Sequence, residues 1–461
     1  MRSRAVFGFA GTLAWLTAFS PGPVRAQAGA DSVKTSFSIA LTGDAIITRP
    51  MSGYQEPAFL RLIDLLRGQD AAFTNLEVNL HDYEPHPMVE SGGLHLRAAP
   101  EMARELAWAG FRLASFANNH TTDWGVEGMR ITQRHAREAG LVVAGVGESL
   151  SEARSARFLE TPKGRVALIA SASTFPTNSR AGRSLGDIPA RPGLSPVRYA
   201  TTNVLTGAGM SALRTVAADL GQTLSASDTV RFLGQAFAAG ARPGRRTTPH
   251  PGDVQEIAAA VRAGRGVSDL VIVSIHAHEG GADRSVPADF LVSFARAMID
   301  AGADVFVGHG PHLLRGIEIY KGKPIFYSLG DFIFENETVE RLPLDDFENV
   351  GVDPATGVAG LNDVRYDTDK RGFPADPLVW ESVVAVPRFR GRALESVELY
   401  PISLGFGKAR TERGRPMLAD EPLSRKIIGD LQRLSAPFGT RIDYRDGVGI
   451  VSLWASEASQ H

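Results

Sequence analysis

Short apolar runs alternate with amphipathic stretches along most of the chain. Runs with strand character lie at 36–44, 70–80, 111–120, 141–147, 165–173, 269–281 and 304–334. Stretches with helical periodicity lie between them, at 57–68, 100–110, 125–140, 254–264 and 287–302. In the first of these helical stretches Phe59, Leu60, Ile63 and Leu66 fall on one apolar stripe. Strands that alternate with helices of this length predict a layered α/β architecture.

Two polar intervals interrupt the alternation. Residues 176–250 are rich in Gly, Pro, Arg, Ser and Thr, which predicts a peripheral insertion, and residues 335–375 form a polar loop region. We expect one main domain over residues 33–410, followed by a C-terminal extension of helix and strand at 411–461. The arginines of the insertion could touch an anionic polymer, or they could belong to a solvated loop.

Composition narrows the class of protein. The chain has 461 residues, of which 43% are hydrophobic and 22% charged, as in soluble globular proteins. A formal charge of −2 gives no electrostatic reason to expect a nucleic acid partner. The absence of cysteine excludes disulfides, thiolate ligands and a cysteine nucleophile.

The N-terminus has the layout of a secretory signal peptide. Arg2 and Arg4 precede an apolar stretch at residues 5–19, and a Pro/Gly-rich segment leads to Ala26 as the expected cleavage position. Cleavage would remove residues 1–26 and shift the formal charge to about −5. We therefore expect export, with the mature protein periplasmic or extracellular; an uncleaved membrane anchor is the alternative.

Polar residues with metal-binding chemistry follow the strand-like runs. They are Asp44, Glu77, Asn119, His120, His276, His309 and His312. Loops at the carboxyl ends of parallel strands meet at one edge of an α/β sheet, so these side chains are expected to converge. Each alone could have a local role instead, as a turn residue, a helix cap or a hydrogen-bonded histidine. Their shared placement favours one site.

The ligand types suit a divalent transition metal. Imidazoles, carboxylates and an amide oxygen without thiolate favour Mn, Fe or Zn, and a carboxylate could bridge two ions about 3.5–4 Å apart. Asp44, Glu77, Asn119, His276, His309 and His312 fall slightly short of two full ligand shells. Waters, His278 or Glu279 could complete them. The histidines without strand-end placement are expected in surface or loop positions: His81, His86, His95, His135, His250 and His461.

Five motifs in order resemble the CapA/PgsA family of capsule or poly-γ-glutamate synthesis proteins, which is similar to the calcineurin-like metallophosphoesterases. They are Gly43-Asp44, Asn75-Leu76-Glu77, Asn118-Asn119-His120, Ser274-Ile275-His276 with Glu279, and Gly308-His309-Gly310-Pro311-His312, followed by the tail Pro324–Phe334. The resemblance implies a four-layer α-β-β-α sandwich with a dinuclear metal site.

The resemblance also implies individual roles. Asp44 and His312 would bind a first ion, Glu77 would bridge, and Asn119, His276 and His309 would bind a second ion. His120 would be the catalytic histidine that protonates a leaving group. Arg49, Asn75 and Glu279 would bind substrate, with Arg49 holding an anionic group.

Two positions depart from the phosphoesterase pattern. Phosphoesterases carry a histidine two residues after the first aspartate, where this chain has Ile46, so the first ion lacks one ligand. Their third motif continues with an acid, where this chain has Thr121, and Asp123 is the candidate to orient His120 instead. Asp331 stands where many relatives carry asparagine.

Four functions remain open from the sequence. The first is an exported CapA-like protein that makes, exports or processes an anionic surface polymer, in which the ions and His120 cleave an amide or ester. The second is a periplasmic phosphoesterase acting on small phosphate esters. The third is a non-catalytic scaffold in a membrane complex for polymer synthesis. The fourth is metal-assisted proton abstraction next to a carbonyl.

Overall fold

The structure is a computed structural model that describes residues 36–453. The expected signal peptide at 1–26 and His461 lie outside these residues. Two large mixed sheets, surrounded by helices, dominate the described chain and establish its α/β class. No helix within residues 36–453 is both long and apolar enough to cross a bilayer.

The first sheet has ten strands in the order β23-β24-β21-β20-β1-β2-β5-β6, with β19 also pairing with β1 and β22 with β21. Strands β1, β2, β5, β6 and β19 are mutually parallel, and the C-terminal strands add antiparallel pairs. The bounds are β1 Ser36–Ile46, β2 Ala71–Leu76, β5 Leu113–Ser115, β6 Val142–Ala144, β19 Asp331–Phe334, β20 Glu381–Arg390, β21 Ala393–Ser403, β22 Met417–Leu418, β23 Ile442–Arg445 and β24 Val448–Val451. The C-terminal strands thus extend the sheet that contains the first strand of the described chain.

The second sheet has six strands in the order β17-β18-β16-β15-β9-β8. Its four inner strands are parallel, and the outer strands β8 and β17 are antiparallel to their neighbours. The bounds are β8 Arg157–Thr161, β9 Gly164–Ala172, β15 Leu270–His276, β16 Val305–His309, β17 Ile317–Tyr320 and β18 Lys323–Phe326.

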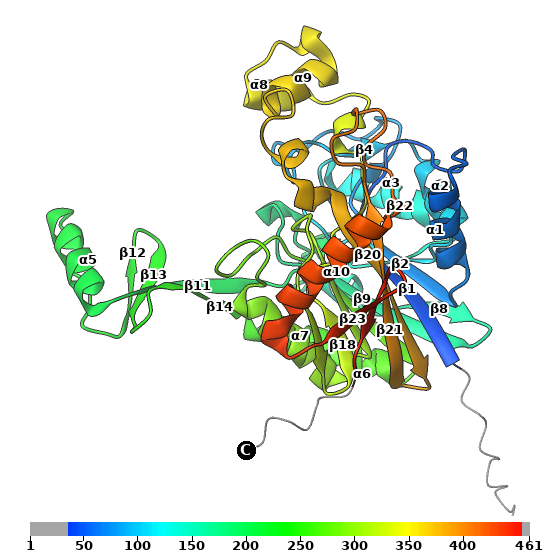
Figure 1. The fold of residues 1–461 in the computed structure, drawn as a ribbon. Coiled ribbons are helices and arrows are strands. Elements are labelled where there is room, and N and C mark those ends of the chain that lie inside the picture. The colour runs from blue at the N-terminus through cyan, green and yellow to red at the C-terminus, as the bar shows by residue number, and fades with distance from the viewer. Residues whose placement is uncertain (1–35, 454–461) are drawn as a thin grey trace, which may run out of the picture. The chain divides into compact units, whose positions relative to one another are not determined.

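Ten helices accompany the sheets within the described residues (Figure 1). They are α1 Pro57–Arg67, α2 Met102–Ala109, α3 Gly125–Glu138, α4 Leu150–Arg154, α5 Gly207–Asp219, α6 Pro251–Arg265, α7 Asp289–Ala301, α8 Leu344–Val350, α9 Gly357–Arg365 and α10 Glu421–Ser435. Six short 3₁₀ helices are η1 Thr177–Ser179, η2 Asn336–Thr338, η3 Pro354–Thr356, η4 Phe373–Ala375, η5 Pro377–Trp380 and η6 Ala436–Phe438.

Strand alternation divides the apolar residues among three main core clusters. In β1, Ile39 and Leu41 belong to a cluster that also contains Ile272 of β15, so the two large sheets share one core. Ala40, on the other face of β1, packs into a cluster with residues of α1, α2 and α3. The outer face of β15 packs in a third cluster with α6 and α7. Apolar burial on both faces explains why the parallel strands read as continuous apolar runs.

The two polar intervals contain regular structure. Residues 176–250 include the strand β10 Gly193–Leu194, which pairs with β7 Val146–Gly147, and a separate four-stranded sheet with α5, drawn green in Figure 1. That sheet is formed by β11 Tyr199–Leu205, β12 Thr229–Phe232, β13 Gln235–Ala239 and β14 Gly244–Pro249. Residues 335–375, expected as a polar loop, form α8 and α9, drawn yellow. A small apolar cluster of Leu94, Phe347 and Leu361 holds these two helices together.

Candidate metal centre

Strand register brings the predicted ligands together in two groups. In the ten-stranded sheet, Asp44 of β1 lies opposite Asn75 of β2 on one side and Asp331 of β19 on the other. In the six-stranded sheet, His276 at the end of β15 lies opposite His309 at the end of β16. The parallel pairing that places polar residues at carboxyl ends therefore builds both halves of the site.

The Asp44 carboxylate joins the two halves. Its Oδ1 atom lies 3.5 Å from His276 Nδ1 and 3.2 Å from His309 Nδ1, and it accepts a hydrogen bond from Asn75 Nδ2 at 2.8 Å. Its Oδ2 atom accepts from the Gly310 backbone N–H at 2.8 Å. Gly310 adopts a φ of +116°, and a Cβ there would come within 2.9 Å of the Ala277 backbone nitrogen. Glycine is therefore required for this close approach.

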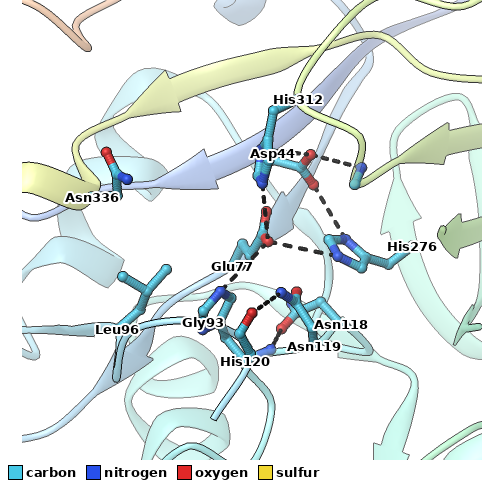
Figure 2. Close-up of polar contacts among 12 residues, drawn as sticks. Asp44, Glu77, Gly93, Leu96, Asn118, Asn119, His120, His276, His312 and Asn336 are labelled. Atoms are coloured by element: carbon cyan, nitrogen blue, oxygen red, sulfur yellow. Dashed lines mark hydrogen bonds and ion pairs between the residues drawn. The ribbon is translucent and has the colours of Figure 1, made fainter. Parts of the chain in front are cut away.

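Glu77 lies at the centre of the site, in the loop immediately after β2. Figure 2 shows its carboxylate facing three imidazoles. Glu77 Oε1 is 3.6 Å from His276 Nε2 and 4.0 Å from both His120 Nε2 and His312 Nε2. Glu77 is fully buried, and neither carboxylate oxygen has a hydrogen-bond partner among the described residues. A buried carboxylate without partners is costly unless a cation or a proton neutralises it.

Hydrogen bonds also position the remaining histidines. His309 Nε2 lies 2.8 Å from the Ser274 hydroxyl, and His312 Nδ1 lies 2.8 Å from Asp331 Oδ1. His312 has a φ of +56°, a left-handed conformation that is unfavourable for a residue with a side chain. His278 Nε2 lies 2.9 Å from His276 Nε2, which adds a fourth imidazole to this side of the site.

His120 is oriented by the acid that the sequence suggested. His120 Nδ1 lies 2.6 Å from Asp123 Oδ2, as expected for an N–H that donates to a carboxylate. Asp123 also accepts from the backbone N–H groups of Gly92 and Leu96 at 2.9 Å, so it is firmly placed. The prediction that Asp123 replaces the missing acid of the third motif is confirmed. His120 Nε2 is left facing Glu77.

The two asparagines of the site have different surroundings. Asn75 is fully buried, donates to Asp44 and accepts from Asn118 Nδ2 at 3.3 Å, so it positions the aspartate. Asn119 donates from Nδ2 to the Gly92 carbonyl at 3.0 Å, and its Oδ1 atom is buried without a partner. The free oxygen of Asn119 is the atom that the predicted ligand role requires.

Arg49 and Glu279, predicted as substrate-binding residues, are engaged elsewhere. Arg49 donates from Nη2 to Glu335 Oε1 at 2.8 Å, and its Nη1 and Nη2 atoms also donate to the carbonyls of Thr411 and Arg413. Glu279 accepts from the Ser173 hydroxyl at 2.7 Å. Glu279 is in no group of possible ligands around Asp44 and Glu77.

Burial and close charges shift the acidities of the clustered carboxyls. Burial, with repulsion from Asp44 and Asp331, raises the pKa of Glu77 well above its ordinary 4.5. Burial opposes ionisation of Asp44 too, but hydrogen bonds to His276 and His309 hold its pKa well below 3.8. Burial raises the pKa of Asp331 to about 6, although the charge of His312 opposes the rise.

The imidazoles are shifted in opposite directions. Burial lowers the pKa of His276 to about 4 and that of His278 well below 6.5, so both are neutral ligand-type imidazoles at neutral pH. Burial would also lower the pKa of His312, but the charge of Asp331 outweighs it and raises the pKa above 6.5.

Three overlapping groups have ligand atoms within 4.8 Å of one another. They are Asp44, His276 and His309; Glu77, His278 and His312; and Asp44, His312 and Asp331. Glu77, Asn119 and Asp331 each have a buried side-chain oxygen without a hydrogen-bond partner among the described residues, and histidines lie beside Glu77 and Asp331, so the residues fit a divalent cation. Asp331 lies near Asp44 and His312, where the sequence lacked a ligand at Ile46.

A cavity of about 200 Å³ opens onto the centre. Its walls come from strand-end residues, from the loop around Gly93, and from the segment after β19. They are Ile46, Gly92, Gly93, Leu94, Leu96, Asn119, His120, His278, His312, Phe334, Asn336, Arg365 and Phe373. A neighbouring cavity of about 390 Å³ shares Gly92, Gly93 and Asn119 with it, which lengthens the space beside the centre.

Sequence reasoning missed several features of the site. The interval expected as a polar loop contains three residues that line the cavity: Asn336, Arg365 and Phe373. The only signal in the sequence for this part of the cavity wall was the helical periodicity at 357–365. His81 and His95 lie in loops, as expected, but both side chains are buried, and His250 is the N-cap of α6. His81 and His95 pack their rings against Trp124, a contact that sequence position does not reveal.

Comparison with known proteins gives the family. Residues 38–336 match the family described as bacterial capsule synthesis protein PGA_cap. The uncharacterized protein y4sH of Sinorhizobium fredii is 40% identical over 441 residues, covering 92% of this chain and 95% of that protein.

Two relatives with assigned names are more distant. The capsule biosynthesis protein CapA of Bacillus anthracis is 27% identical over 60% of this chain, and the PGA biosynthesis protein CapA of Bacillus subtilis is 28% identical over 61%. These matches span 53% and 56% of the two relatives, about half of their lengths. Since the family match covers more than half of the chain, the protein belongs to the PGA_cap family of bacterial capsule synthesis proteins.

Proposed function

We propose that the protein is a metal-dependent hydrolase that acts in the synthesis or processing of an anionic surface polymer of the poly-γ-glutamate kind. The names of the CapA relatives support the polymer, and their partial coverage makes its transfer to this chain a proposal. The observation that carries the metal dependence is Glu77, a buried carboxylate without partners that faces three imidazoles.

The residues that would hold the metal are those of the three ligand groups, with Glu77 as the bridge and Asn119 Oδ1 as a further ligand. A bound divalent cation such as Mn, Fe or Zn would supply Lewis acidity to a carbonyl or phosphoryl group. We infer a dinuclear site from the number of ligands. We also infer the four-layer calcineurin-like arrangement, because two sheets share a core and each packs helices on its other face.

His120 would be the proton donor to the leaving group. Its Nδ1–H donates to Asp123, which leaves Nε2 directed at the space beside Glu77. A proton held at Nε2 can pass to the leaving nitrogen or oxygen of the substrate as its bond breaks. Asp123 would fix the orientation of the ring.

Phosphate ester hydrolysis is the second candidate. The observation in its favour is the His120–Asp123 pair, since it restores the histidine–acid pair that the third motif lacks locally. A non-catalytic scaffold in a polymer-synthesis membrane complex is the third candidate, and it predicts metal without turnover.

We further propose that the protein is exported and acts in the periplasm or outside the cell. The support is the layout of residues 1–26 in the sequence. An anionic polymer, or a small peptide or phosphoester, would be its substrate, and nucleic acid would not be a partner.

A screen of the metal-loaded mature protein tests the proposal. Elemental analysis should give about one to two divalent ions per chain. Turnover of γ-glutamyl peptides that is lost on chelation and in His120→Gln would support the first function. Turnover of p-nitrophenyl phosphate alone would support the phosphoesterase. Metal-free protein with unchanged structure and activity would overturn the proposal.

A further inference from the structure

The wall formed by residues 336–373 carries groups that the metal centre does not use. This wall contains η2, α8, η3, α9 and the first residue of η4, and all but its first residue lie beyond the end of the family match at residue 336. Three of its side chains, Asn336, Arg365 and Phe373, line the cavity over the centre. Phe373 packs its ring against His312 at 5.3 Å, so the wall and the centre are in direct contact.

Arg365 is the only Arg or Lys among the residues that line this cavity in the described part of the chain. Its side chain is half-buried, and its guanidinium carbon lies 5.0 Å from the Tyr366 ring. Among residues 36–453 its guanidinium forms no ion pair and no side-chain hydrogen bond. The nearby acids are taken by other arginines, since Asp363 pairs with Arg410 and Asp369 with Arg413.

The surrounding structure holds the wall in place. Arg413 donates to Glu337 at 2.6–2.7 Å and to Asp369 at 2.7–3.0 Å. Three consecutive residues just after Arg365 adopt left-handed φ values of +47°, +53° and +68°, namely Asp367, Thr368 and Asp369. Such conformations are strained for residues with a side chain and persist only where neighbouring contacts enforce them. The end of α9 is therefore fixed, while the charge at its last residue is left without a partner.

Asn336 supplies a second free group. It is 5% exposed, and its Nδ2 donates to the Tyr366 hydroxyl at 3.0 Å. Its Oδ1 atom is buried and has no partner among the described residues. Asn336 and His312 both line the cavity, and both are labelled in Figure 2. Tyr366 thus links the two groups, because it contacts both the guanidinium and the amide.

We propose that Arg365 and Asn336 form a substrate subsite for an acidic unit joined by an amide bond. Arg365 would bind the carboxylate of that unit, and Asn336 Oδ1 would accept the amide N–H. A phosphate ester offers the anion but has no N–H for Asn336. The subsite rests on the proposed function and gives it a substrate class: amide-linked oligomers that keep one free carboxylate per unit.

Binding measurements on the full-length mature protein test the subsite. The probes are γ-linked triglutamate, the same peptide with its α-carboxylates converted to carboxamides, and inorganic phosphate. We expect Arg365→Gln to weaken triglutamate binding at least about tenfold and to leave the weaker binding of the carboxamide unchanged. Arg365→Lys should recover part of the loss, because it keeps the charge but not the bidentate fork.

Arg262→Gln is the matched control. Arg262 is exposed on α6 and forms no side-chain bond within the described residues, so its loss removes the same charge outside the cavity. Its triglutamate affinity should stay within about twofold of wild type. Asn336→Leu should weaken triglutamate binding, and an ester-linked analogue without the N–H should bind this variant and the wild type equally.

Several outcomes would overturn the subsite. They are unchanged triglutamate binding in both Arg365 variants, an equal loss in the control, and Arg365-dependent binding of phosphate alone. Metal content measured on the same samples separates the two proposals. If the protein holds its full metal content but triglutamate binding does not depend on Arg365, the subsite proposal alone is overturned. If binding depends on Arg365 but the protein never holds metal, the proposal of a metal-dependent hydrolase alone is overturned.

Discussion

The two large sheets contribute different chemistry to the candidate metal centre. The ten-stranded sheet and its loops supply mainly candidate oxygen ligands, from Asp44, Glu77, Asn119 and Asp331. The six-stranded sheet and its loops supply candidate imidazole ligands, from His276, His278, His309 and His312. Neither group alone offers the mixed nitrogen and oxygen set that a borderline divalent ion prefers. The site therefore exists only because the two sheets pack against one shared core.

Removing a candidate oxygen ligand of the ten-stranded sheet should have the largest effect on metal binding. Glu77→Gln keeps the shape but removes the bridging charge, so we expect metal content below about a tenth of wild type and loss of metal-dependent stabilisation. The measurement is elemental analysis with thermal unfolding at saturating metal. Glu90→Gln, exposed in the neighbouring cavity, is the control and should match wild type. Wild-type metal content in Glu77→Gln would refute the bridging role.

Removing a candidate imidazole ligand of the six-stranded sheet should weaken metal binding less, because the candidate oxygen ligands stay in place. We expect His309→Asn to lower metal affinity by on the order of 100-fold, measured by competition with a chelator. His86→Asn, an exposed loop histidine, should have no effect. Equal affinities for the two variants would show that the six-stranded sheet contributes no ligand at this position.

Asp123→Asn separates metal binding from proton transfer on the ten-stranded side. Because Asp123 orients His120 and is not in any ligand group, metal content should stay unchanged while turnover falls on the order of 100-fold. The kinetics should be compared with His120→Gln and with the double variant, which should be no slower than the worse single variant. Full turnover in Asp123→Asn beside an inactive His120→Gln would exclude the positioning role.

Gly43→Ala probes the approach of β1 to β19 that brings Asp44 to Asp331. A Cβ at Gly43 would lie 1.7 Å from the Gly330 carbonyl oxygen, so the strands would have to separate. We expect a loss of about 3 kcal/mol in the free energy of unfolding, measured with urea. Gly429→Ala in α10 meets nothing within 4 Å and should be neutral or slightly stabilising. Similar values for both would contradict the packing argument.

The smallest effect concerns the wall beside the two sheets. His95 Nδ1 lies 3.0 Å from Asp346 Oδ2 in α8; burial opposes its charge, but this bond and the charges of Asp346 and Asp123 raise the pKa of His95 above 6.5. Protonation therefore stabilises the folded state below pH 6.5, and this contribution is lost as pH rises through the folded pKa.

Asp346→Asn keeps the acceptor but removes the charge. It should remove about 1 kcal/mol of stability below pH 6.5 and converge with wild type at higher pH, as measured by urea unfolding across pH. Asp345→Asn, its exposed neighbour, should follow the wild-type curve throughout. If the free energies of unfolding of Asp346→Asn and wild type differed by the same amount at all pH values, the bond between His95 and Asp346 would not explain the pH dependence of stability.

Predictability differed among the residues of the site. Asp44, Glu77, His276 and His309 could be found from the sequence, because an apolar run that ends in a polar residue indicates both a strand and its carboxyl end. Asp123 was also within reach, since it lies three positions from His120 on the same turn. The wall could not be found in this way, because Arg365 and Asn336 lie in a polar interval and meet only through Tyr366.

The sequence by itself determined the α/β class, the family motifs and the ligand types at the strand ends. Only the tertiary structure decided which distant side chains lie beside these residues and which partners they bind. Arg49 is bonded to Glu335, 286 positions away, and Asp331 reaches the centre through the pairing of β19 with β1. Local patterns set strand and helix positions because they depend on neighbouring residues, whereas the partner of a charged side chain depends on which distant segments fold beside it.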